Sequence, residues 1–245
     1  MTVLILGGTG EARALAAALV DGGLDVESSL AGRVRNPRLP VGAVRIGGFG
    51  GVEGLTRYLR VRGVRAVVDA THPFAASISA NAAAACAGAG VPLLRLQRPG
   101  WRDEHGRWTW VDDHDAAAHA AATGRRIFLS TGRQTLDRFT APLAAHEVLV
   151  RVVDPVTLAL PPRWSVLLGR GPYRRDDERA LLLDHGIDTV VTKDSGGELT
   201  RGKLDAADEL GLRVIVVRRP AAPRGVVTVD TVAAARDWVG ALVEA

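Results

Sequence analysis

The chain opens with an apolar strand that runs into a glycine-rich turn, GGTGEAR at residues 7–13. A strand, a glycine turn and a helix in this order let backbone N–H groups and a helix N-terminus face a pyrophosphate, and only glycine allows so close an approach. The turn supplies the first two glycines of the dinucleotide fingerprint G-x-G-x-x-G/A, but Arg13 stands at the third small position. The alternative is a tight turn that binds nothing. The residues expected to hold the phosphates of a nucleotide are Gly7, Gly8, Thr9, Gly10 and Glu11.

Polar residues also end the second predicted strand, in the segment ESSLAGR at 27–33. Enzymes that use NAD place an Asp or Glu about 20 residues after the first glycine, where it bonds the ribose 2′-hydroxyl. Glu27 comes slightly early and should point away from such a ligand. The residues left at the strand end are Ser28, Ser29 and Arg33. Hydroxyls with a guanidinium suit a 2′-phosphate better, which favours NADPH; the alternative is an arginine on a solvated loop.

The fourth predicted strand ends in DATHPFA, residues 69–75. Ligands of an open parallel sheet sit beyond the carboxyl ends of its strands, so Thr71 and His72 should project toward the ligand. Pro73 suits a first helical turn, because it lacks the N–H that would have no partner there. Histidine titrates near neutral pH, which makes His72 a candidate proton donor; a helix-capping or ribose-contact role explains it equally.

Three further polar turns follow strands in the second half of the chain: STGRQ at 130–134, GRGPY at 169–173 and TKDSGG at 192–197. Three such turns together favour a site for a large anionic ligand. Lys193 and Lys203 are the only lysines among 31 basic residues, and lysine, unlike arginine, can give up its proton. Chance retention of the two lysines is the alternative. The residues expected to bind this ligand are Ser130, Thr131, Gly132, Arg133, Arg170, Gly171, Lys193, Asp194, Ser195 and Lys203.

These turns depend on strands and helices that alternate along nearly the whole chain. The predicted strands cover 2–6, 24–30, 43–47, 64–72, 91–99, 108–111, 126–130, 147–153, 165–168, 188–192 and 213–217. Helices between them, such as 11–20 and 75–88, favour βαβ units with helices on both faces of a parallel sheet. The sequence therefore predicts an α/β fold of two Rossmann-like doubly wound domains, with mainly parallel sheets and a cleft between them.

The expected domain boundary lies in a break rich in proline, glycine and charge, RPGWRDEHGRW at 98–108. Residues 1–98 then form the NADPH-binding domain, and 99–245 form a second α/β domain that contributes the anion site. The last strand and helix, at 225–245, can complete either domain.

The composition excludes several classes of protein. No apolar run approaches the about 18–20 residues of a membrane span, and the first residues lack the features of a secretory signal. The single cysteine, Cys86, fits a reducing cytoplasm and reads as a buried helical residue rather than a nucleophile. A net charge of +4 from scattered arginines favours an anionic small molecule over nucleic acid. His114 and His119 lie five residues apart, off a shared helical face, so no metal site is expected.

Taken together, the segments GGTGEAR, SSLAGR, DATHPFA, STGRQ, GRGPY and TKDSGG resemble the precorrin-6A reductase family of cobalamin biosynthesis. The resemblance runs in order over nearly the whole chain. It implies NADPH-dependent reduction of one double bond in the precorrin-6A macrocycle, which gives precorrin-6B. This tetrapyrrole carries several acetate and propionate arms, in agreement with the surplus of arginine. The oligomeric state stays open, with a monomer as one possibility.

The resemblance also implies roles for side chains. Hydride would pass from nicotinamide C4 to an electrophilic carbon of the conjugated system, and a proton would reach the neighbouring carbon. Candidate proton donors, besides water or the ligand itself, are Lys193, His72 and Tyr173, in that order. Ser29 and Arg33 would hold the 2′-phosphate, and the loop at 71–72 the ribose or nicotinamide.

Two other functions fit two nucleotide-type α/β domains. One is a nucleotide-sugar transferase; a UDP-sugar has no 2′-phosphate for the SSLAGR segment to bind. The other is a noncatalytic dinucleotide sensor, which would bind NADPH without turnover and would leave the polar second domain unexplained.

Overall fold

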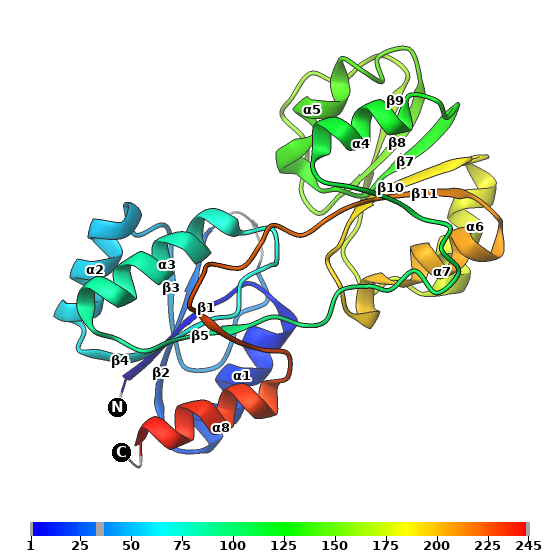
Figure 1. Ribbon diagram of the computed structural model, residues 1–245. Helices are drawn as coiled ribbons and strands as arrows, with labels where there is room; N and C mark the ends of the chain where they lie inside the picture. Colours follow the sequence, from blue (N-terminus) through cyan, green and yellow to red (C-terminus); the bar gives the residue numbers. More distant parts are fainter. Residues whose placement is uncertain (1, 33–36, 244–245) are drawn as a thin grey trace. The chain divides into compact units, whose positions relative to one another are not determined.

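Apolar strands and the helices that follow them build two separate parallel sheets, each of six strands (Figure 1). The computed structural model describes residues 2–32 and 37–243. One unit comprises Met1–Pro99 and Pro220–Ala245, and the other comprises Gly100–Arg219. This confirms the predicted α/β fold with two Rossmann-like parallel-sheet domains. Among the described residues, no helix combines the length and apolar character needed to cross a membrane.

The first unit has the strand order β12-β5-β4-β1-β2-β3, all parallel, which is the Rossmann order read from its sixth strand to its third. The order in which successive strands are added reverses between the central strands β1 and β4. The elements are β1 (Thr2–Leu6), α1 (Gly10–Asp21), β2 (Asp25–Leu30), β3 (Ala43–Ile46), α2 (Gly51–Val61), β4 (Val64–Asp69), α3 (Ala76–Ala89), β5 (Leu93–Leu96), β12 (Val227–Val229) and α8 (Val232–Val243).

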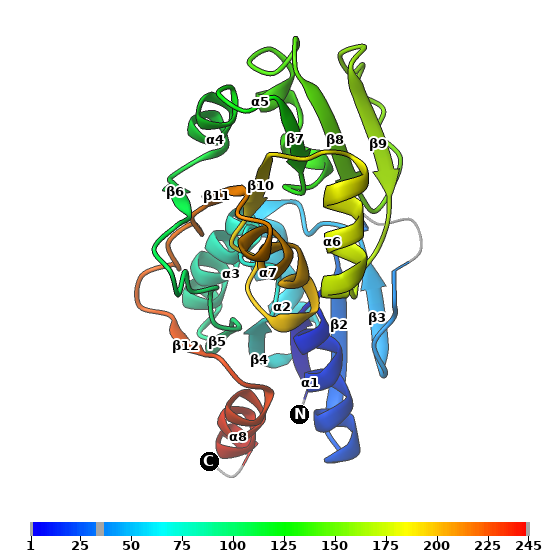
Figure 2. The same cartoon turned by 90° about the vertical axis from the view of Figure 1, so that its right-hand side faces the viewer.

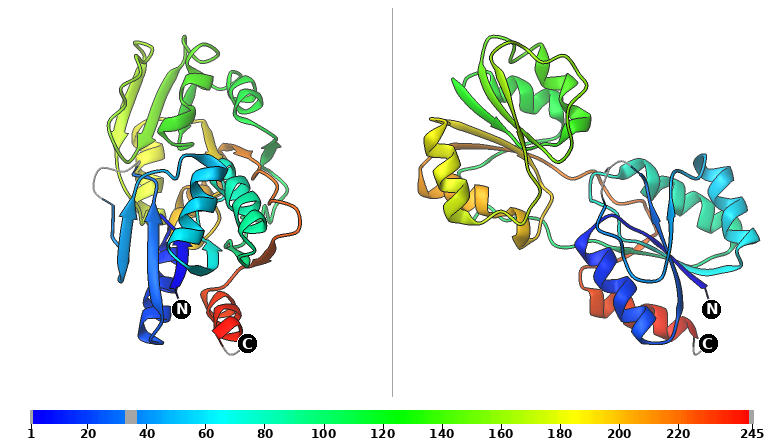
Figure 3. Two further views of the ribbon diagram at one scale, coloured as in Figure 1. Left: turned by 90° about the vertical axis from the view of Figure 1, so that its left-hand side faces the viewer. Right: turned by 180° about the vertical axis from the view of Figure 1, so that it is seen from behind.

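Helices cover both faces of this sheet, α1 and α8 on one side and α2 and α3 on the other (Figures 1 and 3). Strand β1 is therefore buried on both faces, with Val3 and Ile5 toward α1 and α8 and Leu4 and Leu6 toward α2 and α3. Such two-sided burial explains its uninterrupted apolar run. Cys86 lies in the α3 core, and burial raises the pKa of its thiol to about 12, as befits a packing residue.

The second unit has the order β6-β11-β10-β7-β8-β9, again all parallel. Helices α4 and α5 lie on one face, and α6 and α7 on the other (Figure 2). The elements are β6 (Thr109–Val111), α4 (His114–Ala121), β7 (Arg126–Leu129), a 3₁₀ turn (Arg133–Thr135), α5 (Asp137–Thr140), β8 (Glu147–Val152), β9 (Trp164–Leu168), α6 (Arg175–Asp184), β10 (Thr189–Lys193), a second 3₁₀ turn (Glu198–Thr200), α7 (Gly202–Glu209) and β11 (Arg213–Val217).

Two short strands, one near each crossing of the chain between the units, form edges of the two sheets. β6, the first strand after the chain leaves the first unit, pairs with β11, whereas β12, after the chain returns, pairs with β5. The C-terminal segment, which the sequence leaves open, thus completes the first unit. A three-residue strand such as β12 carries no signal that says which sheet it joins. The strands predicted up to residue 217 are all present, with bounds that differ by three residues or fewer.

A buried ion pair joins α6 to β8 in the second unit. Both terminal nitrogens of Arg151 donate to the carboxylate of Glu178, one of them over 2.7 Å. The two residues are only 6% and 3% exposed. The Arg151 guanidinium also lies 3.7 Å from the ring centroid of Tyr173. No sequence pattern indicated this pair, because its members lie 27 residues apart.

Glu178→Gln is expected to destabilise the second unit by about 3–5 kcal/mol, because it leaves the buried guanidinium without its counter-charge. Four of the five tryptophans lie in this unit, so a urea midpoint followed by tryptophan fluorescence measures the effect. Asp177→Asn removes the same charge from an exposed neighbour and should cost less than about 1 kcal/mol. Equal midpoints for the two variants would contradict a structural role for the pair.

Candidate functional site

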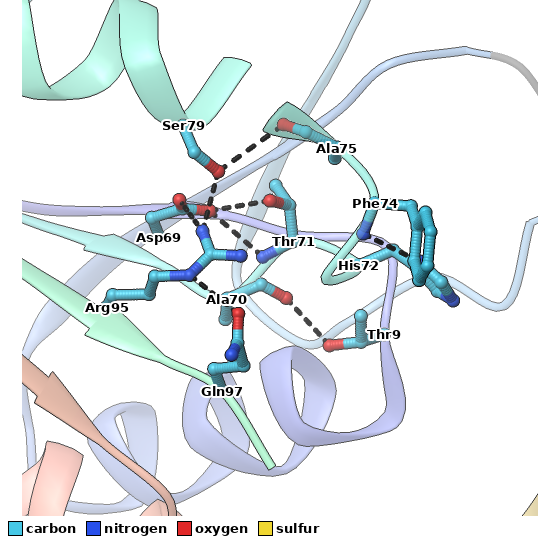
Figure 4. Close-up of polar contacts among 10 residues, drawn as sticks. All are labelled: Thr9, Asp69, Ala70, Thr71, His72, Phe74, Ala75, Ser79, Arg95 and Gln97. Carbon is cyan, nitrogen blue, oxygen red and sulfur yellow. Dashed lines mark hydrogen bonds and ion pairs between the residues drawn. The ribbon is translucent and has the colours of Figure 1, made fainter. Parts of the chain in front are cut away.

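The reversal of strand order between β1 and β4 brings the glycine turn and the DATHPFA loop together. Leu6 pairs with Asp69 at the carboxyl ends of the two strands, and the Ala70 N–H donates to the Leu6 carbonyl over 2.9 Å. The Thr9 hydroxyl then donates to the Ala70 carbonyl over 2.8 Å (Figure 4). The same hydroxyl accepts from the Ala12 N–H over 3.1 Å. Open α/β sheets bind ligands at such a reversal.

The glycine turn has the shape that a phosphate group needs. Gly8 has a φ of +113°, which favours glycine, and a Cβ added there would meet no atom within 4 Å. At Gly10 the nearest atom is a guanidinium nitrogen of Arg13, 3.8 Å away. Helix α1 begins at Gly10, and the first amides of a helix have no acceptor within it. Open space, a permitted backbone and outward N–H groups therefore meet at one point, and they fit a pyrophosphate.

A salt bridge governs the charge at this helix start. Arg98, which follows β5, donates to the Glu11 carboxylate over 2.8 Å, and both side chains are partly exposed. The Glu11 carboxylate would repel a phosphate, so the N–H of Glu11 rather than its side chain suits this ligand. The sequence analysis missed Arg98. The local signal there is the proline-glycine break that follows it, and its partner Glu11 lies 87 residues away in the sequence.

A buried network holds the loop that follows β4 (Figure 4). Asp69 accepts from the Thr71 N–H over 3.1 Å and from its hydroxyl over 2.6 Å. Arg95, on β5, donates to the other oxygen of Asp69 and, over 2.6 Å, to the Ser79 hydroxyl. Asp69 and Arg95 are 2% and 3% exposed. Because the Thr71 hydroxyl donates inward to Asp69, it can offer a ligand only an acceptor.

His72 lies at the tip of the same loop and is half-buried. Its Nδ1 accepts from the Phe74 N–H over 3.2 Å, which places the proton of a neutral imidazole on Nε2. Helix α3 begins three residues after Pro73, at Ala76, so the expected placement of Pro73 in its first turn is wrong. Within the loop, the N–H groups of Phe74 and Ala75 donate to His72.

The end of β2 departs from the sequence prediction. Ser28 is paired with Ile5 and faces the core beneath α1, where it is 1% exposed, so its assignment to the 2′-phosphate is wrong. Ser29 lies on the opposite face and accepts over 2.9 Å from Arg45, a residue that the sequence analysis missed. Arg33 lies outside the described residues. The glycine cluster GGFGG after β3 is the sequence signal that could have drawn attention to Arg45.

In the second unit, strand order reverses between β7 and β10, and the turns after these two strands meet. The Ser130 N–H donates to the Val191 carbonyl over 2.9 Å. Gly132 has a φ of +91°, and a Cβ added to it would lie 3.5 Å from the Lys193 Nζ. Burial lowers the pKa of Lys193 to about 8. A cation that can release its proton thus lies beside the STGRQ turn.

Asp194 and Lys203 instead make contacts inside the second unit. Asp194 accepts from the Trp101 N–H over 3.0 Å and pairs with Arg219 over 2.9 Å. Lys203 is 4% exposed and donates to the Thr200 carbonyl over 2.6 Å, with its ammonium 4.6 Å from the Trp101 ring. Burial lowers the pKa of Lys203 to about 7. Direct contact of either side chain with an anionic ligand, as expected from the sequence, does not fit this burial.

The remaining predicted residues lie on the same carboxyl edge. Arg133 donates to the Pro155 carbonyl over 3.3 Å, and Ser195 follows Lys193 in a tight turn. Arg170 and Gly171 come after β9, which β8 separates from β7. The Tyr173 hydroxyl donates to the Gly169 carbonyl over 2.9 Å, and burial raises its pKa, so this hydroxyl is poorly placed to give up a proton.

Comparison with known proteins yields relatives over the full length. The chain is 55% identical over 243 residues to precorrin-6A reductase of Rhodococcus erythropolis and 51% identical over 242 residues to that of Mycobacterium tuberculosis; each match covers 98% of both chains. It is 34% identical to cobalt-precorrin-6A reductase of Priestia megaterium, over 92% of this chain and 93% of the relative.

A solved structure titled CobK precorrin-6A reductase superimposes with a TM-score of 0.92 and 43% identity, over 99% of this chain and 97% of that one. The model of the family described as precorrin-6x reductase CbiJ/CobK matches residues 2–240. The family model covers nearly the whole chain, which also carries a dinucleotide-type turn, and relatives of the same length are more than half identical to it. The chain therefore belongs to the precorrin-6x reductase family.

Proposed function

We propose that the protein uses NADPH to reduce one double bond of the precorrin-6A macrocycle, giving precorrin-6B, in cytoplasmic cobalamin biosynthesis. The observation that carries this proposal is that the reversal of strand order in each unit holds residues suited to one of the two reactants. One holds an open glycine turn suited to pyrophosphate, and the other holds Lys193 beside a polar turn. The names of the relatives support the same substrate.

The first unit would hold the cofactor, which supplies the hydride. The amides from Gly8 to Glu11 would bind the pyrophosphate, because the Gly7 N–H already donates to the Ser29 carbonyl. Arg98 would offset the charge of the Glu11 side chain. Ser29 and Arg33 would bind the 2′-phosphate. The loop that Asp69 holds would bring His72 to the nicotinamide or its ribose, where its Nε2–H can donate.

The second unit would bind the carboxylate arms of the macrocycle through Ser130, Gly132 and Arg133, with Arg170 from the turn after β9. Thr131 is 1% exposed, so its side chain does not fit direct contact with the ligand. Lys193 would contact the ligand and give the proton. When hydride reaches one carbon of the conjugated system, the electron pair moves to the neighbouring carbon, which takes the proton. Because Lys193 is half protonated near pH 8, it carries this proton at neutral pH and can release it without a large penalty.

The proposal is tested by titrating the purified protein with NADPH and NADH, following nicotinamide fluorescence, and then adding precorrin-6A. NADPH binding followed by stoichiometric oxidation on addition of the tetrapyrrole is expected. Binding without oxidation, with the cobalt form of the substrate also inert, would favour a sensor. Binding of a UDP-sugar in place of NADPH would favour a transferase.

Gly8→Val is expected to weaken NADPH binding by about 100-fold or more, the equivalent of losing two charge-assisted hydrogen bonds to the pyrophosphate. The side chain would fill the open space at this turn and strain a backbone at φ +113°. Gly23→Val is the matched control, because Gly23 also has a positive φ, +79°, and open surroundings at the other end of α1. Comparable affinity in the two variants would contradict a phosphate site at Gly8.

The rate of reduction is expected to fall about tenfold per pH unit above pH 8, because only the protonated form of Lys193 donates. Lys193→Arg should keep substrate binding within a few-fold but lose about 100-fold or more in kcat together with this limb of the profile. Single-turnover rates between pH 6.5 and about 9.5 measure both effects. A profile that Lys193→Arg leaves unchanged would assign the proton to another group.

A further inference from the structure

A second glycine-rich turn, which the proposed function does not use, follows β3. The segment Gly47-Gly48-Phe49-Gly50-Gly51 joins β3 to α2, and four of its glycines have no atom within 4 Å of an added Cβ. Gly54, on α2, is packed so closely on the Phe49 carbonyl that a Cβ there would overlap it. This packing fixes the position of Phe49 beside the end of β3.

Arg45, on β3, is held on Phe49 by three hydrogen bonds. One terminal nitrogen donates over 2.9 Å to both the Ser29 hydroxyl and the Gly47 carbonyl, and the other donates over 3.1 Å to the Gly48 carbonyl. The guanidinium carbon lies 3.9 Å from the ring centroid of Phe49. A flexible side chain is thereby fixed as an oriented, partly exposed cationic fork.

This fork lies one strand away from the phosphate-binding turn. Arg45 and Ser29 are paired in register across β2 and β3, and the Ser29 carbonyl accepts from the Gly7 N–H over 2.9 Å. The Gly47 N–H likewise donates to the Leu30 carbonyl over 2.8 Å. In this fold the ribose of the adenosine lies beyond the end of the second strand, where Ser29 and Arg45 meet.

The charge at this point suits a phosphate rather than a ribose hydroxyl. Glu27, the nearest acidic residue on the same face of β2, is 8% exposed and lies against Tyr58 and Arg62 under α2. The pKa of the Tyr58 hydroxyl is raised, mainly by burial and secondly by the Glu27 carboxylate. Glu27 thus lies below the surface, and among the described residues Arg45 is the charged group presented at the strand end.

We propose that Arg45, supported by Phe49 and Ser29, binds the 2′-phosphate of NADPH and sets the preference for NADPH over NADH. The inference deepens the proposed function and rests on it. It adds a residue of β3 to Ser29 and Arg33, the residues that the sequence predicts at this phosphate. Two charge-assisted hydrogen bonds from one planar fork would recognise the dianion, and NADH offers no group to receive them.

The test uses calorimetry on the full chain with adenosine 2′,5′-bisphosphate and with 5′-AMP, which differ only in the 2′-phosphate. Arg45→Gln is expected to weaken binding of the bisphosphate by about 100-fold or more, the loss of two charge-assisted hydrogen bonds, and to leave 5′-AMP within about two-fold. Arg57→Gln removes the same charge from an exposed position on α2 and should leave both affinities unchanged. Arg33→Gln is measured alongside, because the sequence assigns Arg33 to the same phosphate.

Thermal unfolding of each variant separates loss of binding from loss of folding. If Arg45→Gln is unstable, Arg45→Lys provides the second readout, with an intermediate loss for the bisphosphate because the charge stays and the fork is lost. An equal loss for the two nucleotides, no loss for either, or a loss confined to Arg33→Gln would overturn the role of Arg45. If the unaltered protein binds neither nucleotide and no NADPH, the cofactor assignment itself fails.

Discussion

The proposed cofactor site depends on two hydrogen bonds made by the Thr9 hydroxyl. This hydroxyl accepts from the Ala12 N–H and so fixes the start of α1, and it donates to the Ala70 carbonyl and so fixes the loop after β4. One buried side chain thereby sets the distance between the glycine turn and His72. The net worth of each bond is only about 1 kcal/mol, but a buried group left without its partner costs more.

Buried charge reinforces the same design in both units. Asp69 and Arg95 tie the ends of β4 and β5 to α3, and Arg151 and Glu178 tie β8 to α6. Each pair lies at or near the carboxyl edge of its sheet, where side chains must be rigid but cannot be wholly apolar. Ion pairs of this kind contribute less to net stability than to a single arrangement of the loops they hold.

Much of the fold could be predicted from local pattern, since an apolar run followed by a helix repeats through the chain. The glycine turn was also visible, because only glycine suits φ +113° and a close phosphate. The sheet that β12 joins was not visible, since a three-residue strand does not specify its partner. Ser28 failed as a ligand residue because adjacent residues of a strand face opposite sides of the sheet.

The cations were the hardest residues to assign. Lys203 stood out by its rarity, yet it lies in the interior against Trp101. Arg45, Arg98 and Arg151 were hidden among many arginines, because their roles come from partners distant in sequence or from stacking on a ring. Charge on a side chain can be read from sequence, whereas the direction in which it is held depends on tertiary contacts.

The central claim is that hydride passes from NADPH into the macrocycle. A single turnover with NADPH carrying deuterium on the transferring face of nicotinamide C4, followed by mass spectrometry of the tetrapyrrole, tests it most directly. The account predicts one deuterium per product molecule and one NADP⁺ formed. Unchanged NADPH, or a reduced product without deuterium, would contradict it.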